Sequence, residues 1–169
     1  LELGVPFSDP LADGVVNQLA AQRGLASGTT PRGVMEAVST IRRQSQLPVV
    51  LYIYFNLVHR YGLEQFIADA ARAGVDGKLA LDLPPEEAGR YETLMRAAGL
   101  CTVYPVAPST PDDRVAAIAE RTRGFLYYVS REGVTGMQQA VAGDLAAQLG
   151  RIRARTELPV AVGFGISNA

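Results

Sequence analysis

Short apolar runs alternate with helix-like runs along all 169 residues of the chain, and this alternation constrains the fold more than any other feature. The apolar runs are rich in Val, Leu, Ile and Tyr, which is typical of strands covered on both faces. Six such runs joined by helical crossovers indicate parallel βα units. The predicted strands are Leu1–Val5, Val49–Phe55, Lys78–Leu83, Thr102–Val106, Phe125–Val129 and Val160–Phe164.

Helix signals lie between the predicted strands. Thr30 and Pro31 have the residue types of an N-cap and a first helical position, and Gly74 and Gly99 have the type that follows a helix end. The predicted helices are Val16–Ala26, one opening at Thr30-Pro31, Leu63–Ala73, Pro85–Ala98, one opening at Thr110-Pro111 and one capped by Asp144.

The remaining question of architecture is whether the strands form an open sheet or a barrel. Polar or glycine-bearing motifs follow several strands, among them Ser8-Asp9, Asn56, Asp82 and Gly163–Gly165. A barrel brings all strand ends to one rim, whereas an open sheet concentrates its site at one switch point. We therefore expect an α/β fold, a TIM (β/α)8 barrel that is incomplete, because a full barrel takes roughly 200–250 residues. Residues 1–169 are predicted to form one partial barrel domain.

Composition narrows the classes of partner. The formal net charge is −1 and the pI is about 5.9, which gives no reason to expect nucleic acid or an anionic membrane as a partner. The single cysteine, Cys101, has no internal disulfide partner and suits a reducing compartment. No apolar run is long enough to span a bilayer. We expect a cytoplasmic protein without a metal site.

Two acids stand at the two ends of the first loop. Glu2 lies in an apolar, strand-like stretch, where a carboxylate is costly to bury without a task or a partner. Asp13 follows a Ser-Asp-Pro turn and precedes Gly14. A strand that carries one acid, followed by a loop that carries a second, is an arrangement that parallel α/β folds use for acid–base chemistry. The alternative is a loop with capping acids.

The run from Glu2 to Gly14, ELGVPFSDPLADG, resembles the signature of the tryptophan synthase alpha chain family. Further stretches follow in that family's order and spacing: Tyr54-Phe55-Asn56, Gly74–Gly77 with Asp82–Glu87, Tyr127–Gly136, and Gly163–Ser167. The resemblance covers the whole chain. It implies a TIM barrel of which this chain holds the end of strand 2 through strand 7.

The resemblance also implies an activity, the cofactor-free retro-aldol cleavage of indole-3-glycerol phosphate to indole and glyceraldehyde 3-phosphate. Glu2 matches the family's general acid–base, and Asp13 matches the carboxylate that holds the indole N–H. Residues at positions that match the family's substrate contacts are Tyr54, Tyr127, Arg131, Thr135, Gly136 and Phe164, and Gly163 and Gly165 match its phosphate site. The implied partner is a beta chain that carries pyridoxal phosphate, in an alpha2beta2 complex.

The sequence departs from the family pattern at Val15, Lys78 and Leu81. Lys78 stands at a position that is usually apolar, so its charge is either buried in the barrel interior or extends out past the strand end. Leu81 replaces a smaller residue and is expected to crowd the indole pocket. Two other functions remain open: an inactive partial barrel that only binds the beta chain, and a related phosphate-binding barrel enzyme. The sequence does not separate a synthase subunit from a free lyase that releases indole.

Overall fold

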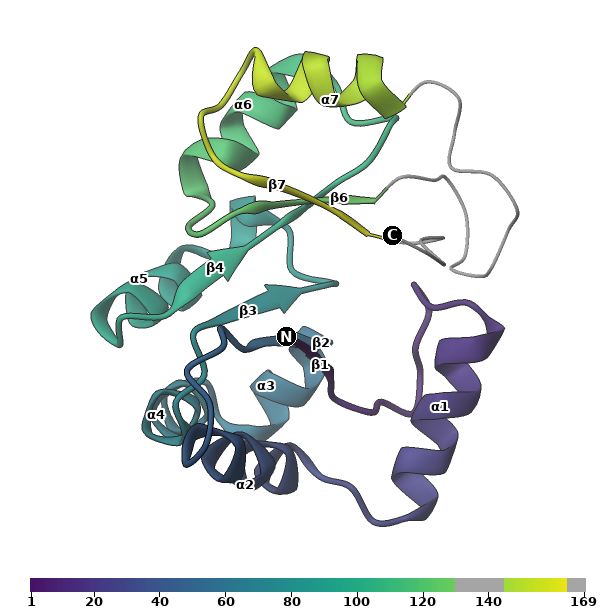
Figure 1. The fold of residues 1–169 in the computed structure, drawn as a ribbon, viewed down its shortest axis with the longest axis vertical. Helices are drawn as coiled ribbons and strands as arrows, with labels where there is room; N and C mark the ends of the chain where they lie inside the picture. Colours follow the sequence, from purple (N-terminus) through teal and green to yellow (C-terminus); the bar gives the residue numbers. More distant parts are fainter. Residues whose placement is uncertain (130–144, 164–169) are drawn as a thin grey trace.

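A computed structural model of this protein describes residues 1–129 and 145–163, which contain seven short strands in two sheets. All neighbouring strands are parallel, and their order follows the sequence, β1-β2-β3-β4 in one sheet and β5-β6-β7 in a second. The strands are β1 (Glu2–Gly4), β2 (Val50–Ile53), β3 (Gly77–Ala80), β4 (Cys101–Val103), β5 (Pro105–Val106), β6 (Leu126–Val129) and β7 (Val160–Gly163). Figure 1 shows β6 and β7 above β1, β2 and β3.

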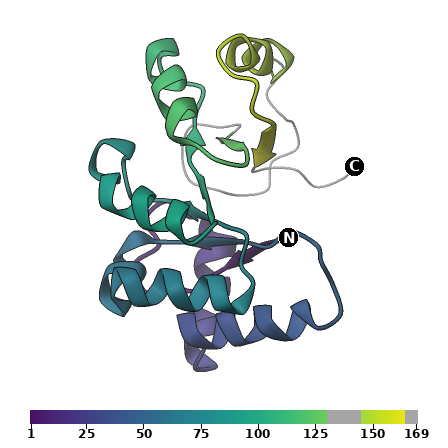
Figure 2. The ribbon, with the colours of Figure 1, turned by 90° about the vertical axis from the view of Figure 1, so that its left-hand side faces the viewer.

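Helices follow most of the strands and form a layer outside them. Figure 2 faces this layer and shows the helices stacked in sequence order, from α2 at the bottom to α6 and α7 at the top. The helices are α1 (Val15–Ala26), α2 (Pro31–Arg42), α3 (Phe55–Tyr61), α4 (Leu63–Ala73), α5 (Gly89–Ala97), α6 (Asp112–Arg121) and α7 (Leu145–Arg153), with a 3-10 helix η1 at Pro85–Glu87. Helix α1 lies apart from the layer and has no buried residues (Figure 1).

The predicted helix ends are confirmed at two places. Thr30 caps α2, because its Oγ1 accepts a hydrogen bond of 3.1 Å from the backbone N–H of Gly33. Gly74 ends α4 with φ at 88°, a left-handed conformation that favours glycine. The cap predicted at Asp144 lies outside the described residues.

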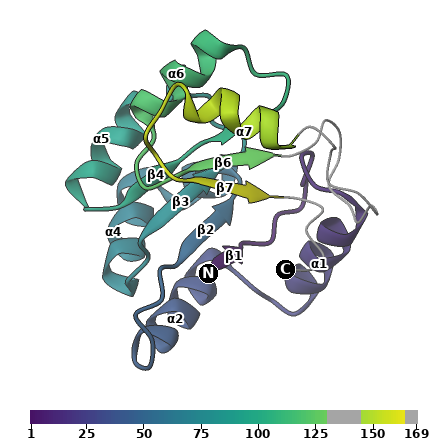
Figure 3. The ribbon, with the colours of Figure 1, turned by 45° about the horizontal axis from the view of Figure 1, so that its top comes forward.

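The strands curve into an arc with different side chains on its two sides. The larger apolar cluster fills the space between the strands and the outer helices. A smaller cluster lies inside the arc and contains Tyr52, Leu79, Val103 and Tyr127. The register places the first three in line, because Tyr52 pairs with Leu79 and Leu79 with Val103. In Figure 3 this curvature brings β7 round toward β1. The expected incomplete parallel barrel is confirmed.

The structure corrects three predicted elements. The strand predicted at Thr102–Val106 is two strands in two sheets, interrupted at Tyr104, and Pro105 has no backbone N–H to give to a ladder. The helix predicted at Pro85–Ala98 is two elements, because the backbone first makes 3-10 bonds from Glu87 to Pro84 and from Ala88 to Pro85. The helix predicted to open at Thr110-Pro111 begins at Asp112.

Helix α3 is a further correction, because no helix was predicted there and the predicted strand Val49–Phe55 ends on its first residue. Asp82 favours this helix, since its Oδ1 accepts a hydrogen bond from the backbone N–H of Phe55, the first helical residue. Val58 is buried and Gly62 ends the turn with φ at 94°. His59 is exposed on α3, as expected of a histidine without a catalytic role.

Lys78 takes neither of the positions predicted for it. Its side chain is 1% exposed and points away from the barrel interior, into the outer core between β3 and the helices α3, α4 and α5. The Nζ atom lies 4.7 Å from the ring centroid of Tyr91, 5.0 Å from Phe55 and 5.7 Å from Phe66. It has no hydrogen-bond partner among the described residues. Burial lowers the pKa of this amine to about 7, and the nearby charge of Asp82 acts weakly in the other direction.

Within the described part of the chain, none of the helices has both the length and the apolar character needed to cross a membrane.

Candidate active site

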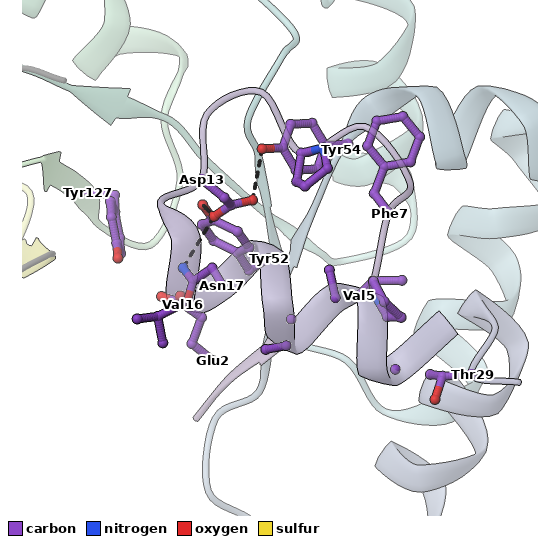
Figure 4. A pocket seen from close by; sticks show the side chains of 16 residues that line it. Glu2, Val5, Phe7, Asp13, Val16, Asn17, Thr29, Tyr52, Tyr54 and Tyr127 are labelled. Carbon is purple, nitrogen blue, oxygen red and sulfur yellow. Dashed lines mark hydrogen bonds between the residues drawn. The ribbon is translucent and has the colours of Figure 1, made fainter. Parts of the chain in front are cut away.

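A cavity of about 580 Å³ lies inside the arc, along β1 and β2 and against α1. This volume is within the range of sites that bind small molecules. Figure 4 shows its polar side chains coming from three directions: Glu2 from β1, Asp13 and Asn17 from the loop and α1, and tyrosines from β2 and β6. The other lining residues are mainly apolar or small.

Asp13 is the most strongly held side chain in the cavity. It is 4% exposed and its carboxylate accepts three hydrogen bonds, all from uncharged donors. The Tyr52 hydroxyl donates to Oδ1 at 2.9 Å, the Tyr54 hydroxyl to Oδ2 at 2.8 Å, and the Asn17 side-chain amide to Oδ1 at 3.2 Å. An ionised carboxylate is an acceptor-only group, so this set of donors suits it.

The loop that carries Asp13 is fixed by its own backbone and by β2. The backbone N–H of Asp13 donates to the carbonyl of Pro10, and that of Ala12 donates to the Tyr54 hydroxyl at 3.0 Å. The ring of Phe7 packs 5.0 Å from that of Tyr54. Tyr54 therefore ties the loop to the strand and holds Asp13 through the same hydroxyl.

The two tyrosines that donate to Asp13 remain protonated. Burial is the main cause that raises the pKa of Tyr52 and of Tyr54 above the ordinary range, and the Asp13 carboxylate adds to it. A phenol whose pKa is raised in this way keeps its proton at every pH at which a protein of this kind is studied. Both hydroxyls are therefore permanent donors to Asp13.

Glu2 has a different environment from Asp13. Partial burial raises the pKa of its carboxyl, while the nearby Tyr127 hydroxyl and the positive charge of the amino terminus act in the opposite direction. The same pairing acts on Tyr127, whose pKa is raised to about 12 by burial and by the Glu2 charge. The cavity thus contains one carboxyl that holds its proton more tightly than usual and one carboxylate surrounded by donors. In such a pair, Glu2 can act as the acid and Asp13 as the hydrogen-bond acceptor.

Gly163 leaves the room that Tyr127 occupies. A Cβ atom at position 163 would lie 2.1 Å from the Tyr127 hydroxyl oxygen and 2.3 Å from its Cζ. Any larger residue at the end of β7 would therefore force the Tyr127 ring to move. The predicted role of Gly163 at a phosphate stays a prediction.

The structure brings Glu2, Asp13, Tyr54 and Tyr127 together on one cavity, with Gly163 directly behind Tyr127. Val15 is exposed, and Leu81 packs in the inner cluster without lining the cavity, so the expected crowding of the pocket by Leu81 is not seen. The other predicted site residues lie outside the described residues: Arg131, Thr135, Gly136, Phe164 and Gly165.

Sequence reasoning missed two residues of the site, Tyr52 and Asn17. Tyr52 lies on β2 and Tyr54 directly follows that strand in extended backbone, so the two-residue spacing puts both side chains on the same side. Asn17 follows Asp13 by four positions at the start of α1, a spacing that brings side chains together on a helix. In residues 1–129 and 145–163 no cluster of three His, Cys, Asp or Glu side chains is placed to hold a metal ion.

The comparisons with known proteins identify the family of this chain. The family model described as tryptophan synthase alpha chain matches residues 1–169. The chain belongs to the tryptophan synthase alpha chain family. It is 55% identical to the alpha chain of Opitutus terrae over 168 residues, which are 99% of this chain and 63% of that one. It is 50% identical to the alpha chain of Citrifermentans bemidjiense over 167 residues, with 99% and 62% covered.

A solved structure places the fold in the same family. A mutant tryptophan synthase alpha-subunit from Pyrococcus furiosus superposes with a TM-score of 0.90 at 41% identity, covering 98% of this chain and 66% of that one. The chain thus spans slightly less than two thirds of the length of the alpha chains it matches. The TIM barrel expected from the sequence is the fold of these relatives, and this alpha-family chain has the larger part of it.

Proposed function

We propose that this chain carries the acid–base site of a lyase that cleaves indole-3-glycerol phosphate to indole and glyceraldehyde 3-phosphate in tryptophan biosynthesis. The observation that supports this most is the pair of acids on one cavity: Glu2, with a raised pKa, and Asp13, held by three uncharged donors. The reaction is inferred from the family membership, and the different roles of the two acids are inferred from their surroundings in the cavity.

In this proposal the Glu2 carboxylic acid protonates carbon C3 of the indole ring. The ring nitrogen then carries positive charge, and its N–H donates a hydrogen bond to the Asp13 carboxylate, which stabilises that charge. The Glu2 carboxylate next accepts the proton of the side-chain hydroxyl. The bond between C3 and the glycerol carbon breaks, its electron pair returns to the ring, and the glycerol carbon becomes the aldehyde. Glu2 regains its proton and both products are neutral at the reacting atoms.

Tyr127 supports the first proton transfer by orienting Glu2. Both side chains line the cavity, and the raised pKa of Tyr127 keeps its hydroxyl protonated as a donor for Glu2. Because Tyr127 lies on β6 and Glu2 on β1, this pairing brings together side chains from the two sheets.

We propose a tryptophan synthase beta chain as the protein partner, in an alpha2beta2 complex. Pyridoxal phosphate would be bound by that partner, and the proposed chemistry of this chain uses no cofactor. A free lyase that releases indole would use the same two acids, so the choice between the two depends on the partner and not on the acids.

The test is an assay for indole and glyceraldehyde 3-phosphate with indole-3-glycerol phosphate as substrate. We would assay residues 1–169 and a completed chain, in which the remaining segments are supplied from the Opitutus terrae alpha chain, each with and without a beta chain. Equal amounts of both products from the completed chain are expected. A folded completed chain that binds the beta chain and forms no indole would show a binding role without catalysis.

Replacing Gly163 with alanine is expected to lower turnover of the completed chain roughly 10- to 100-fold. The new methyl group would overlap the Tyr127 hydroxyl and force that ring out of its place in the wall of the cavity that also contains Glu2. The measurement is kcat for indole release, with unfolding by urea to show that the variant is folded. Gly150→Ala is the matched control, because a Cβ there meets nothing within 4 Å. Equal kcat values for the two variants would contradict the proposed contact.

A further inference from the structure

Tyr52 makes a contact that its position in the sequence does not suggest. Its ring belongs to the inner apolar cluster with Leu79, Val103 and Tyr127, where an aromatic side chain usually serves only to fill space. Its hydroxyl, however, reaches the Asp13 carboxylate at 2.9 Å, and the residue as a whole is 9% exposed. A hydrogen bond between a phenol and a buried carboxylate is among the stronger ones in proteins.

We propose that Tyr52 is a positioning residue for Asp13, which determines the carboxylate oxygen that receives the ring N–H of the substrate. The inference rests on the proposed function, since it concerns the same site. It adds a second phenol to the one at Tyr54 and assigns different roles to the two.

The two carboxylate oxygens of Asp13 differ in the number of hydrogen bonds that they already accept. Each carboxylate oxygen accepts about two hydrogen bonds. Oδ1 already accepts one from the Tyr52 hydroxyl and one from the Asn17 amide, so its positions are filled. From the described part of the chain Oδ2 accepts one, from the Tyr54 hydroxyl, which leaves one position for a ligand. A ring N–H that enters the cavity is therefore directed to Oδ2.

Tyr52 and Tyr54 differ in what else their hydroxyls do. The Tyr54 hydroxyl also accepts from the backbone N–H of Ala12, so its loss would release the loop as well as the carboxylate. Tyr52 reaches Asp13 from within the barrel, and its bond closes Oδ1 without a contact to that loop backbone. Removing the Tyr52 hydroxyl alone would open a second acceptor position beside the first. The bound ring would then have two ways to orient, of which one brings C3 to Glu2.

The experiment is a double-mutant cycle with Tyr52→Phe and Asp13→Asn in the completed chain. We expect Tyr52→Phe to lower kcat roughly tenfold and to leave KM within about twofold, because orientation fails more than binding. In the Asp13→Asn background the same change should have no further effect on kcat. Purely structural damage would instead lower kcat equally in both backgrounds.

The matched control is Tyr104→Phe. Tyr104 donates to the Glu92 carboxylate at 2.7 Å, a bond of the same kind in the outer core and outside the cavity. We expect Tyr104→Phe to lower stability to urea while its kcat stays within twofold of the parent.

Two readouts separate this proposal from the proposed function. The first is the same cycle measured by urea unfolding without ligand, where coupling between positions 52 and 13 is expected whether or not the chain is a lyase. The second is binding of indole to residues 1–169, followed by indole fluorescence, since the chain has no tryptophan of its own. Coupling with no turnover by any variant would overturn the proposed function alone. Additive effects of the two substitutions, in unfolding and in kcat, would overturn the role of Tyr52.

Discussion

Replacing Glu2 with glutamine is expected to lower turnover of the completed chain by roughly 10²- to 10⁴-fold, the usual contribution of a general acid–base group. Glutamine keeps the size and polarity of the side chain, but it carries no proton that it can give to a ring carbon. Ligand binding should be largely unchanged, because Asp13 and the cavity walls remain. The measurements are kcat for indole release and the affinity for indole.

The pH profile gives a second readout for Glu2. Since burial raises the pKa of Glu2, its acid form persists to higher pH than that of an ordinary glutamic acid, and activity that needs this acid falls as pH rises through that pKa. This limb should be absent from the residual activity of Glu2→Gln. Glu36→Gln, an exposed change on α2, is the control and should keep the parent profile. Turnover near the parent rate in Glu2→Gln would contradict the assignment of Glu2 as the acid.

Replacing Lys78 with methionine is expected to stabilise the fold by about 2–4 kcal/mol at pH 7. Methionine has a similar length, no charge and a sulfur that packs well against rings. The ammonium it replaces is fully buried, and contacts with the rings of Phe55, Phe66 and Tyr91 offset only part of the cost of removing it from water.

The stabilisation by Lys78→Met should decrease as the pH rises. The pKa of Lys78 is about 7 in the native state and 10.5 in the reference state, so above pH 10.5 the amine is neutral in both states. As pH falls from 10.5 to 7 the unfolded chain takes up the proton first, and the native fold loses stability progressively. The advantage of Lys78→Met should therefore be largest at pH 7 and below and should shrink toward pH 10.

Two features of the sequence make the test of Lys78 direct. It is the only lysine in the chain, so lysine labelled with carbon-13 gives one side-chain signal whose titration reports its pKa. Urea unfolding of Lys78→Met at pH 7 and pH 9.5 gives the change in stability, with the exposed Arg96→Met as control. A lysine signal that titrates near 10.5, or a variant less stable than the parent at both values, would contradict the buried charge.

The alternation of strands and helices was predictable because it follows from the local amino-acid composition. Each strand of a parallel barrel is covered on both faces, so the apolar runs from Val49 to Val160 stand out from the polar helices between them. Departures from this alternation depend on contacts with residues that are distant in the sequence. Helix α3 is favoured by Asp82, which lies on another strand end, and nothing local to Phe55 signals that contact.

The same distinction applies to the site. Glu2 and Asp13 were found because they lie in one short, specific run of residues. Tyr52 was missed because a tyrosine in a strand is usually a packing residue, and only the register of β1 and β2 places its hydroxyl beside Asp13. The contact between Tyr127 and Gly163 also depends on the neighbouring strands β6 and β7, which sequence reasoning placed in order but not in register.

The measurement that tests the central claim most directly is exchange of the C3 proton of indole in D2O, followed by proton NMR with residues 1–169. The proposed chemistry requires Glu2 to add a deuteron to C3 and the ring to lose its proton, with Asp13 on the ring N–H. Exchange well above the uncatalysed rate is predicted for the parent, at background for Glu2→Gln and much slower for Asp13→Asn. A folded parent chain that binds indole and exchanges it no faster than buffer would contradict the account.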